Sequence, residues 1–258
     1  MKPLAFALVL TIPWLWSCDS QPTQPSEAGP GASQPNTLSS TSLTEQLNRS
    51  PRFDPNNFVQ TVDNPLFPLK PGTRFVFEGV EDGESEINVT IVTHDRKSIL
   101  GVSATVVLDR VFVHGELKEK TFDWYAQDKQ GNVWYLGENT KEYEDGKVVS
   151  TEGSWLAGRD GAKPGIIMLA HPQVGDSYRQ EFLVGVAEDQ ARVVARDLDQ
   201  RVPYGSFDNC VRTVEFTALE PGVKEAKIYC PGVGFVRAHD VEGPATRLVL
   251  TQITHSSR

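Results

Sequence analysis

The sequence predicts an all-β protein in which antiparallel strands form curved sheets, arranged as a half-barrel or a sandwich with little helix. Two segments, 87–91 and 121–125, alternate apolar and polar residues, which is typical of half-buried strands. Turn residues such as His114-Gly115, Asp145-Gly146 and Pro221-Gly222 separate the apolar runs. A weak internal repeat also divides the body into two similar halves. Together these features favour short strands joined by polar turns.

The first 17 residues read as a secretion signal. Met1-Lys2 precedes an apolar run from Leu4 to Trp16, which is too short to be a stable membrane span. The run ends in Leu15-Trp16-Ser17-Cys18, which resembles the bacterial lipobox and implies that Cys18 is lipidated. Trp16 departs from the small or aliphatic residue usual at that position. A plain signal peptide followed by a coincidental cysteine is the alternative.

Residues 18–57 form a predicted lipidated and disordered tether. Of the 32 residues from Asp19 to Ser50, 21 are Ser, Thr, Pro, Gln or Gly, and none is aromatic. Such a stretch cannot bury enough apolar surface to offset the entropy lost on ordering. As a flexible coil it would span on the order of 30 Å. The tether would therefore hold a folded domain clear of a membrane surface.

The body of the protein, from about Phe58 to Thr254, contains many runs with the period of a strand. The predicted strands are Arg74–Glu78, Ile87–Ile91, Val102–Val113, Thr121–Tyr125, Val133–Leu136, Ala191–Ala195, Cys210–Thr217, Val233–Ala238 and Arg247–Thr251.

The two halves of the body, 58–150 and 175–258, are predicted to be copies of one β unit. Gly72 to Phe75 matches Gly175 to Tyr178, and the segments 101–125 and 205–229 align without a gap. Chance alignment of strand-rich sequence is the alternative. The Gly-rich connector, 151–174, reads either as a functional loop or as a crossover that fills the seam between the copies.

Cys210 and Cys230 lie ten residues on either side of Glu220, whose Glu220-Pro221-Gly222 segment forms a predicted turn. They would face each other across a hairpin at a separation that a disulfide spans. An export signal implies an oxidising compartment, which favours the bond. The alternatives are two free thiols or a metal pair, and the latter needs more ligands than the sequence offers nearby.

Composition and motifs point away from several functional classes. The formal charge of −9 makes nucleic acid an unsuitable partner. The sequence shows no nucleophile, dinucleotide or P-loop motif, and predicts no cofactor. It also predicts no metal site, because the five histidines have no ligand spacing and the acidic runs at 81–84 and 142–146 read as solvated turns rather than calcium loops.

A carboxylate-based hydrolase, such as a glycosidase, is the alternative function. Asp123 and Glu138 are its candidate acid pair, with Trp124 and Trp134 as a sugar platform. A purely structural envelope protein is a further alternative. The main prediction assigns no catalytic residue.

Several phrases resemble a family of bacterial secreted proteins and lipoproteins without an established activity. These phrases are Val62-Asp63-Asn64-Pro65-Leu66-Phe67-Pro68-Leu69-Lys70-Pro71-Gly72-Thr73, Asp123 to Asp128, Gly131 to Tyr135, Lys163 to Met168 and Val202 to Phe207. The segment from Tyr229 to Val236 also resembles the end of periplasmic β domains that usually have Ala at the position of Cys230. The resemblance implies an envelope location but no mechanism.

The sequence therefore predicts a non-enzymatic lipoprotein of the cell envelope, anchored to a membrane through a lipid on Cys18. Its β domain would face the periplasm or the outside of the cell and bind a protein partner or a small apolar ligand such as a lipid. Concave sheets bind acyl chains in other lipoprotein carriers, a comparison at the level of fold only. The predicted ligand-binding residues are Phe122, Trp124, Trp134 and Phe182.

Overall fold

Strands account for most of the described chain. The computed structural model describes residues 51–81, 83–242 and 247–256, and the predicted signal peptide, Cys18 and most of the tether lie outside them. The strands are β1 (Thr73–Glu81), β2 (Glu84–Ile99), β3 (Val102–Val113), β4 (Glu116–Gln127), β5 (Val133–Glu144), β6 (Lys147–Ser150), β7 (Trp155–Leu156), β8 (Lys163–Met168), β9 (Ser177–Arg179), β10 (Glu181–Phe182), β11 (Gln190–Val202), β12 (Gly205–Phe216), β13 (Lys224–Cys230), β14 (Gly234–Glu242) and β15 (Arg247–His255). Among the described residues the helical segment is one 3-10 turn, η1 (Pro55–Asn57).

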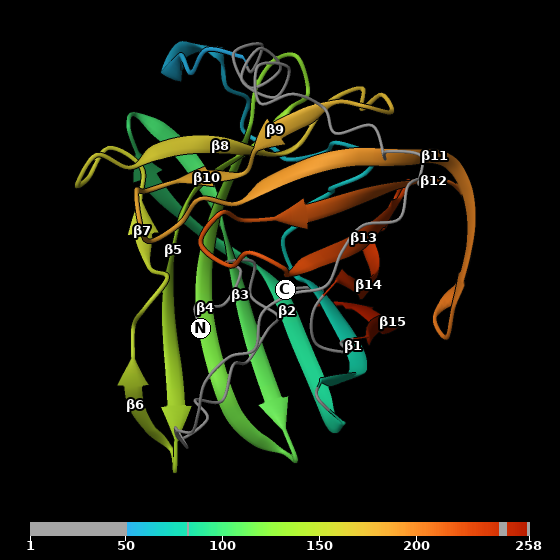
Figure 1. The fold of residues 1–258 in the computed structure, drawn as a ribbon. Coiled ribbons are helices and arrows are strands. Elements are labelled where there is room, and N and C mark those ends of the chain that lie inside the picture. Colours follow the sequence, from blue (N-terminus) through green and yellow to red (C-terminus); the bar gives the residue numbers. More distant parts are fainter. Residues whose placement is uncertain (1–50, 82, 243–246, 257–258) are drawn as a thin grey trace, which may run out of the picture.

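All of these strands belong to one antiparallel sheet, which confirms the predicted all-β class (Figure 1). The strand order is β10-β8-β5-β4-β3-β2-β1-β15-β14-β13-β12-β11-β9, and β6 and β7 add to β5. The end strands β9 and β10 are separated only by Gln180. One short segment therefore forms both ends of the ladder, and the sheet must curve round to reach it.

Two-residue turns set the register of three hairpins. Leu100-Gly101, His114-Gly115 and Asp145-Gly146 connect β2 to β3, β3 to β4 and β5 to β6, and both residues of each turn have a positive φ. This is the geometry of type I′ turns, whose twist matches that of the flanking strands. The turns predicted at His114-Gly115 and Asp145-Gly146 are present.

The predicted connector, 151–174, holds two strands rather than a long irregular loop. β8 pairs with β5, and Ile166, Ile167 and Met168 are almost fully buried. Gly165 allows this arrangement, because a Cβ there would lie only 2.1 Å from the carbonyl oxygen of Gln180. The connector thus completes the sheet next to β10.

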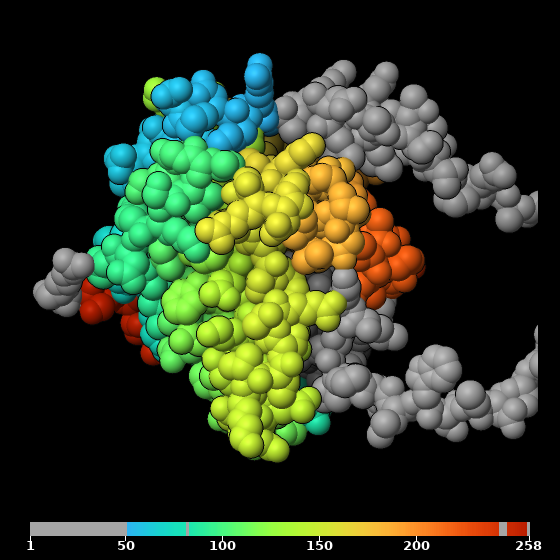
Figure 2. Space-filling model, turned by 90° about the vertical axis from the view of Figure 1, so that its left-hand side faces the viewer, coloured from blue at the N-terminus to red at the C-terminus, as the bar shows by residue number. Residues whose placement is uncertain are grey.

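The segment before β1 packs against one end of the sheet (Figure 2, blue). Packing begins inside the predicted tether, since Phe53 lies 5.5 Å from Trp134 between ring centroids. Farther on, the Gln127 side chain accepts hydrogen bonds from the backbone N–H groups of Asp63 and Asn64 at 2.9 and 2.8 Å. These bonds hold the following residues, including Phe67, over the interior of the curved sheet.

Candidate functional site

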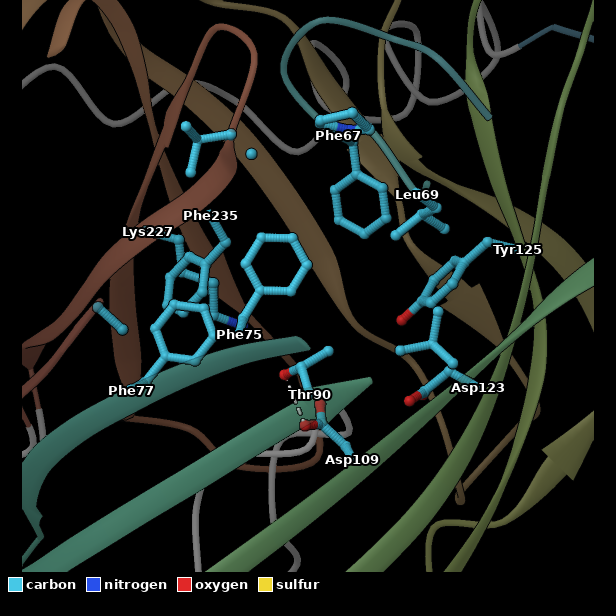
Figure 3. Close-up of a pocket in the computed structure, with 15 residues that line it drawn as sticks. Phe67, Leu69, Phe75, Phe77, Thr90, Asp109, Asp123, Tyr125, Lys227 and Phe235 are labelled. Atoms are coloured by element: carbon cyan, nitrogen blue, oxygen red, sulfur yellow. Dashed lines mark hydrogen bonds between the residues drawn. The ribbon is translucent and has the colours of Figure 1, made fainter. Parts of the chain in front are cut away.

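A cavity lies on the inner side of the curved sheet, where β1–β4 face β13 and β14 (Figure 3). Its volume is about 70 Å³, enough for more than one water-sized molecule. The lining residues are Phe67, Pro68, Leu69, Phe75, Phe77, Thr90, Val107, Asp109, Asp123, Tyr125, Lys227, Val233, Gly234, Phe235 and Ala238. Their strands come from both predicted repeats.

Aromatic rings form one wall of the cavity. Phe75 and Phe77 point to the same side of β1 because they are two residues apart, and their ring centroids lie 6.4 Å apart. The Phe77 ring lies 4.9 Å from that of Phe235, on β14. Phe67 lies 5.3 Å from Tyr125, in an edge-to-face arrangement. The wall therefore joins four parts of the chain, namely the segment before β1, β1, β4 and β14.

Two aspartates stand on the polar side of the cavity. Asp109 is 6% exposed and accepts a hydrogen bond from the Thr90 hydroxyl at 2.7 Å. Burial raises the pKa of Asp109 to about 6, against the opposing effect of this bond. Asp123 is 2% exposed, and burial raises its pKa well above the usual value. Both carboxyl groups therefore hold protons more tightly than they would in water.

The hydroxyl of Tyr135 links Asp123 to Glu138. It lies 2.6 Å from Asp123 Oδ1 and 3.1 Å from Glu138 Oε2. One hydroxyl has one proton to donate, so both contacts are hydrogen bonds only when one carboxyl group is protonated. Burial, followed by the repulsion between the two carboxylates, raises the pKa of Glu138.

A backbone irregularity brings these groups to one face. Tyr135 and Glu138 are three residues apart and would face opposite sides of a regular strand. The register shifts where β4 pairs with β5, between Asp123 and Tyr125, and Gly137 in β5 has a φ of +136°. This bulge turns both side chains toward the interior.

Lys227 supplies a positive charge to the same interior. Its ammonium group lies 2.8 Å from Glu215 and 3.1 Å from Glu225, and all three side chains are buried. The Tyr229 hydroxyl donates a further hydrogen bond to Glu215 at 3.0 Å. Burial acts to lower the pKa of Lys227, but the two carboxylates outweigh it and raise that pKa. Lys227 therefore stays charged.

Further buried acids surround this group. Burial raises the pKa of Glu119 to about 7 and that of Asp189 to about 8, and it also raises the pKa of Glu181. Within the described residues, no three His, Cys, Asp or Glu side chains are arranged to hold a metal ion. The interior is thus rich in carboxyl groups that favour the protonated form.

The four predicted ligand-binding residues do not line this cavity. Trp124 stacks under Lys97 at 3.2 Å, and Phe122 lies near Lys120. Phe182 lies near Arg179 and Lys163, and Trp134 donates a hydrogen bond to Asp128 at 2.9 Å. On β4 and β5, the residues Phe122, Trp124 and Trp134 face away from Asp123 and Tyr135, their immediate neighbours in the sequence.

The candidate acid pair is brought together, but the proposed sugar platform is not. Asp123 and Glu138 are register partners on β4 and β5. Trp124 and Trp134 lie on the opposite face of the same strands, next to Lys97 and Asp128. A sugar stacked on these tryptophans would therefore not reach the two carboxyl groups.

The predicted disulfide is present. Cys210 and Cys230 are bonded across the β12–β13 hairpin, with 4.2 Å between their Cα atoms and both residues fully buried.

The predicted lipidation of Cys18 lies outside the described residues. In the described part of the chain, no helix has the length and apolar character needed to cross a membrane.

No family model matches the chain. No curated protein matches it either. One solved structure matched by the chain is described as "a putative lipoprotein from Parabacteroides distasonis ATCC 8503". It is 12% identical, has a TM-score of 0.39, and the match covers 74% of this chain and 99% of that chain. At this level the similarity supports no conclusion about function.

Sequence reasoning did not find the lining residues Phe67, Phe75, Phe77, Asp109 and Lys227. The spacing of Phe75 and Phe77 was a usable signal, because it places two large rings on one face of a strand. A second usable signal was Lys227, which is a charged residue within the largely apolar end of β13. Their meeting across the sheet depends on its curvature, which the sequence does not show.

Proposed function

We propose that this protein is a lipid-anchored envelope protein that binds a small ligand in the cavity between β1–β4 and β13–β14, without catalysing a reaction. The observation that carries the proposal is the cavity itself, which combines an apolar aromatic wall with a few convergent polar groups. This combination is typical of ligand-binding sites in proteins. The lipobox-like sequence ending in Cys18 supports the envelope location.

The wall is suited to an apolar portion of a ligand. The Phe77 ring neighbours both Phe75 and Phe235, and such rings contribute much of the binding energy at protein sites. Gly234 helps to build this wall, because its φ is +92° and a Cβ there would lie 3.3 Å from Pro68. The turn before β14 can therefore approach the segment that carries Phe67.

Native mass spectrometry tests the proposal. The full chain, purified in mild detergent from a lipid-containing bacterial host, should retain a small molecule that is lost on denaturation. Val233→Trp provides the control, because Val233 lines the cavity and is half-buried. The larger side chain should fill the cavity, so this variant should be isolated without the ligand.

Urea unfolding of the Val233→Trp protein establishes that it is folded. A wild-type protein that carries no small molecule and binds none from a set of small amphiphiles would contradict the ligand-binding proposal. Crosslinked protein partners recovered in that case would favour a structural role in the envelope.

A further inference from the structure

The cavity presents two chemically different surfaces to whatever occupies it. The carboxyl groups of Asp109 and Asp123 stand on one side, and the rings of Phe75 and Phe77 stand on the other (Figure 3). The Phe235 ring extends the aromatic side. Aromatic faces carry a partial negative charge, so both surfaces attract positive charge.

Lys227 lines the same cavity, and its charge lowers the pKa of Asp109, but only as the smallest of the effects that oppose burial. Its ammonium group is bound between Glu215 and Glu225 at 2.8 and 3.1 Å. Those two carboxylates already exceed its single charge. Asp109 and Asp123 are therefore left to be neutralised by protons or by a bound cation.

Resting on the proposed function, we propose that the ligand is a small organic cation, with its ammonium group beside Asp109 and Asp123 and its alkyl groups against Phe75, Phe77 and Phe235. Quaternary ammonium ions are bound in this way by aromatic rings with nearby carboxylates. Hard metal ions instead require several oxygen ligands, and phenyl rings supply none. An anion would be repelled by either carboxyl group in its ionised form, whereas a neutral molecule would leave both groups protonated and would gain nothing from their charge.

Binding of the cation should release protons. Burial raises the pKa of Asp109 to about 6 and also raises that of Asp123 well above its usual value, so these carboxyl groups hold protons that a cation would displace. Affinity should therefore rise with pH. The titratable groups that interact with this pair come from β4, β5, β10 and β13, and they are Glu119, Tyr125, Tyr135, Glu138, Glu181 and Lys227.

Isothermal titration calorimetry of the full chain in detergent micelles tests the charge requirement. The probes are choline and 3,3-dimethylbutan-1-ol, a neutral molecule of nearly the same shape. Choline should bind at least about tenfold more tightly than its neutral counterpart, the size of effect expected of a desolvated cation–π site. Choline should also bind more tightly at about pH 7.5 than at about pH 5.5, with proton release.

Isosteric variants locate the effect. Asp109→Asn and Asp123→Asn, separately and combined, should lower choline affinity about tenfold or more, while binding of the neutral alcohol stays unchanged. Asp208→Asn is the matched control, because Asp208 is exposed on β12 and does not line the cavity. Phe77→Leu keeps the site apolar but removes a ring, so it should lower the affinity for choline more than the affinity for the alcohol.

The outcomes separate this inference from the proposed function. Equal binding of choline and the alcohol would overturn the cation assignment and leave an apolar binding protein. Absence of binding by both, together with native protein free of any ligand, would overturn both. Phosphatidylcholine vesicles then identify the source of the cation, since displacement of choline by vesicles indicates a lipid headgroup and no displacement indicates a free solute.

Discussion

At the scale of single residues, the inner face of β13 holds an ammonium group that is buried with two carboxylates. Lys227 and Glu215 are each 4% exposed at the side chain, and Glu225 is 5% exposed. Removing one member of a buried ion pair leaves a charge without compensation, which is more damaging than losing the attraction alone. Lys227 is therefore the position at which a single substitution should most disturb the charged interior.

We predict that Lys227→Met lowers the free energy of unfolding by about 3–5 kcal/mol at neutral pH. The loss should be smaller at acidic pH, because burial raises the pKa of Glu225 and its protonation removes part of the uncompensated charge. Urea unfolding at both pH values measures the difference. Lys224→Met is the control, because Lys224 pairs with Glu242 at a site where both side chains are about half exposed, and such pairs contribute about 0–1 kcal/mol.

The raised pKa of Glu119 makes stability depend on pH. Burial raises the pKa of Glu119 from 4.5 to about 7. Between these two pH values the folded protein keeps the proton on Glu119, whereas the unfolded chain has released it. The contribution of Glu119 to the free energy of unfolding is therefore fully present below the pKa that Glu119 has in the unfolded chain. It is lost as the pH rises toward and through about 7. Asp109 and Asp189 act in the same direction.

Glu119→Gln should remove part of this dependence. The amide does not ionise, so the variant should lose less stability than the wild type between about pH 5 and about pH 8. Urea unfolding across this range measures the slope. Glu144→Gln, on the exposed end of β5, should leave the slope unchanged. Wild-type stability that increases over the same range would show that other groups dominate.

The sequence around Asp123 shows how much of the site could be predicted. The alternation in Thr121–Tyr125 predicts a strand, which is present within β4, and the candidate pair Asp123 and Glu138 is brought together. Such alternation is typical of a half-buried strand, with one buried and one exposed face. In the structure both faces are buried, with Asp123 at 2% and Trp124 at 6% exposure. Local alternation cannot show that a sheet curves enough to enclose its polar face.

At the scale of elements, the disulfide fixes the β12–β13 hairpin. Cys210 and Cys230 close a loop with a sequence separation of 20. The Cys210→Ala/Cys230→Ala variant should lose about 3 kcal/mol of unfolding free energy, the amount expected for closing a loop of this length. Urea unfolding measures the loss. Intact-mass analysis after alkylation in denaturant should count two more labelled thiols in reduced than in unreduced wild-type protein, and equal counts would contradict the bond.

Gly165 determines whether β8 can lie against the segment that ends the sheet. An added Cβ would lie 2.1 Å from the Gln180 carbonyl oxygen, and the backbone there cannot move aside freely. Gly165→Ala should lower the unfolding free energy by about 1–3 kcal/mol, as overpacked positions do. Gly205→Ala is the matched control, because its nearest neighbour is the Phe207 ring at 3.6 Å. Similar losses in both variants would contradict this role.

The connector was the least predictable element. The sequence left open a functional loop or a crossover whose apolar stretch fills the seam between the copies, and in the structure Ile166-Ile167-Met168 lies in β8 and is buried in the core. A short apolar run has no period that separates a strand from a buried loop. Its pairing with β5 is a long-range contact. Hairpins with Asp145-Gly146 or His114-Gly115 turns, in contrast, were predictable because their signal is local.

At the scale of the whole molecule, the predicted repeat agrees in order with the ladder but stays a prediction. The strands β5-β4-β3-β2-β1 and β14-β13-β12-β11-β9 run in the same order, with β15 between them. The cavity lies where β1–β4 of the first series meet β13 and β14 of the second. Neither half contains the whole lining, which explains why no single motif in the sequence indicated the site.

The proposed lipid anchor on Cys18 would determine where the cavity meets its ligand. If Cys18 is lipidated, the full chain expressed in a bacterium with lipoprotein processing should fractionate with membranes. Its mature mass should correspond to a chain that begins at Cys18 and carries acyl groups.

Cys18→Ser removes the thiol that accepts the lipid, so this variant should lack that mass and the cleavage that depends on it. Ser17→Ala is the control, because it keeps a small residue before Cys18 and should still be processed. A wild-type protein that is cleaved elsewhere and recovered without lipid would mean that Cys18 follows a plain signal peptide, and the cavity would then belong to a freely diffusing protein.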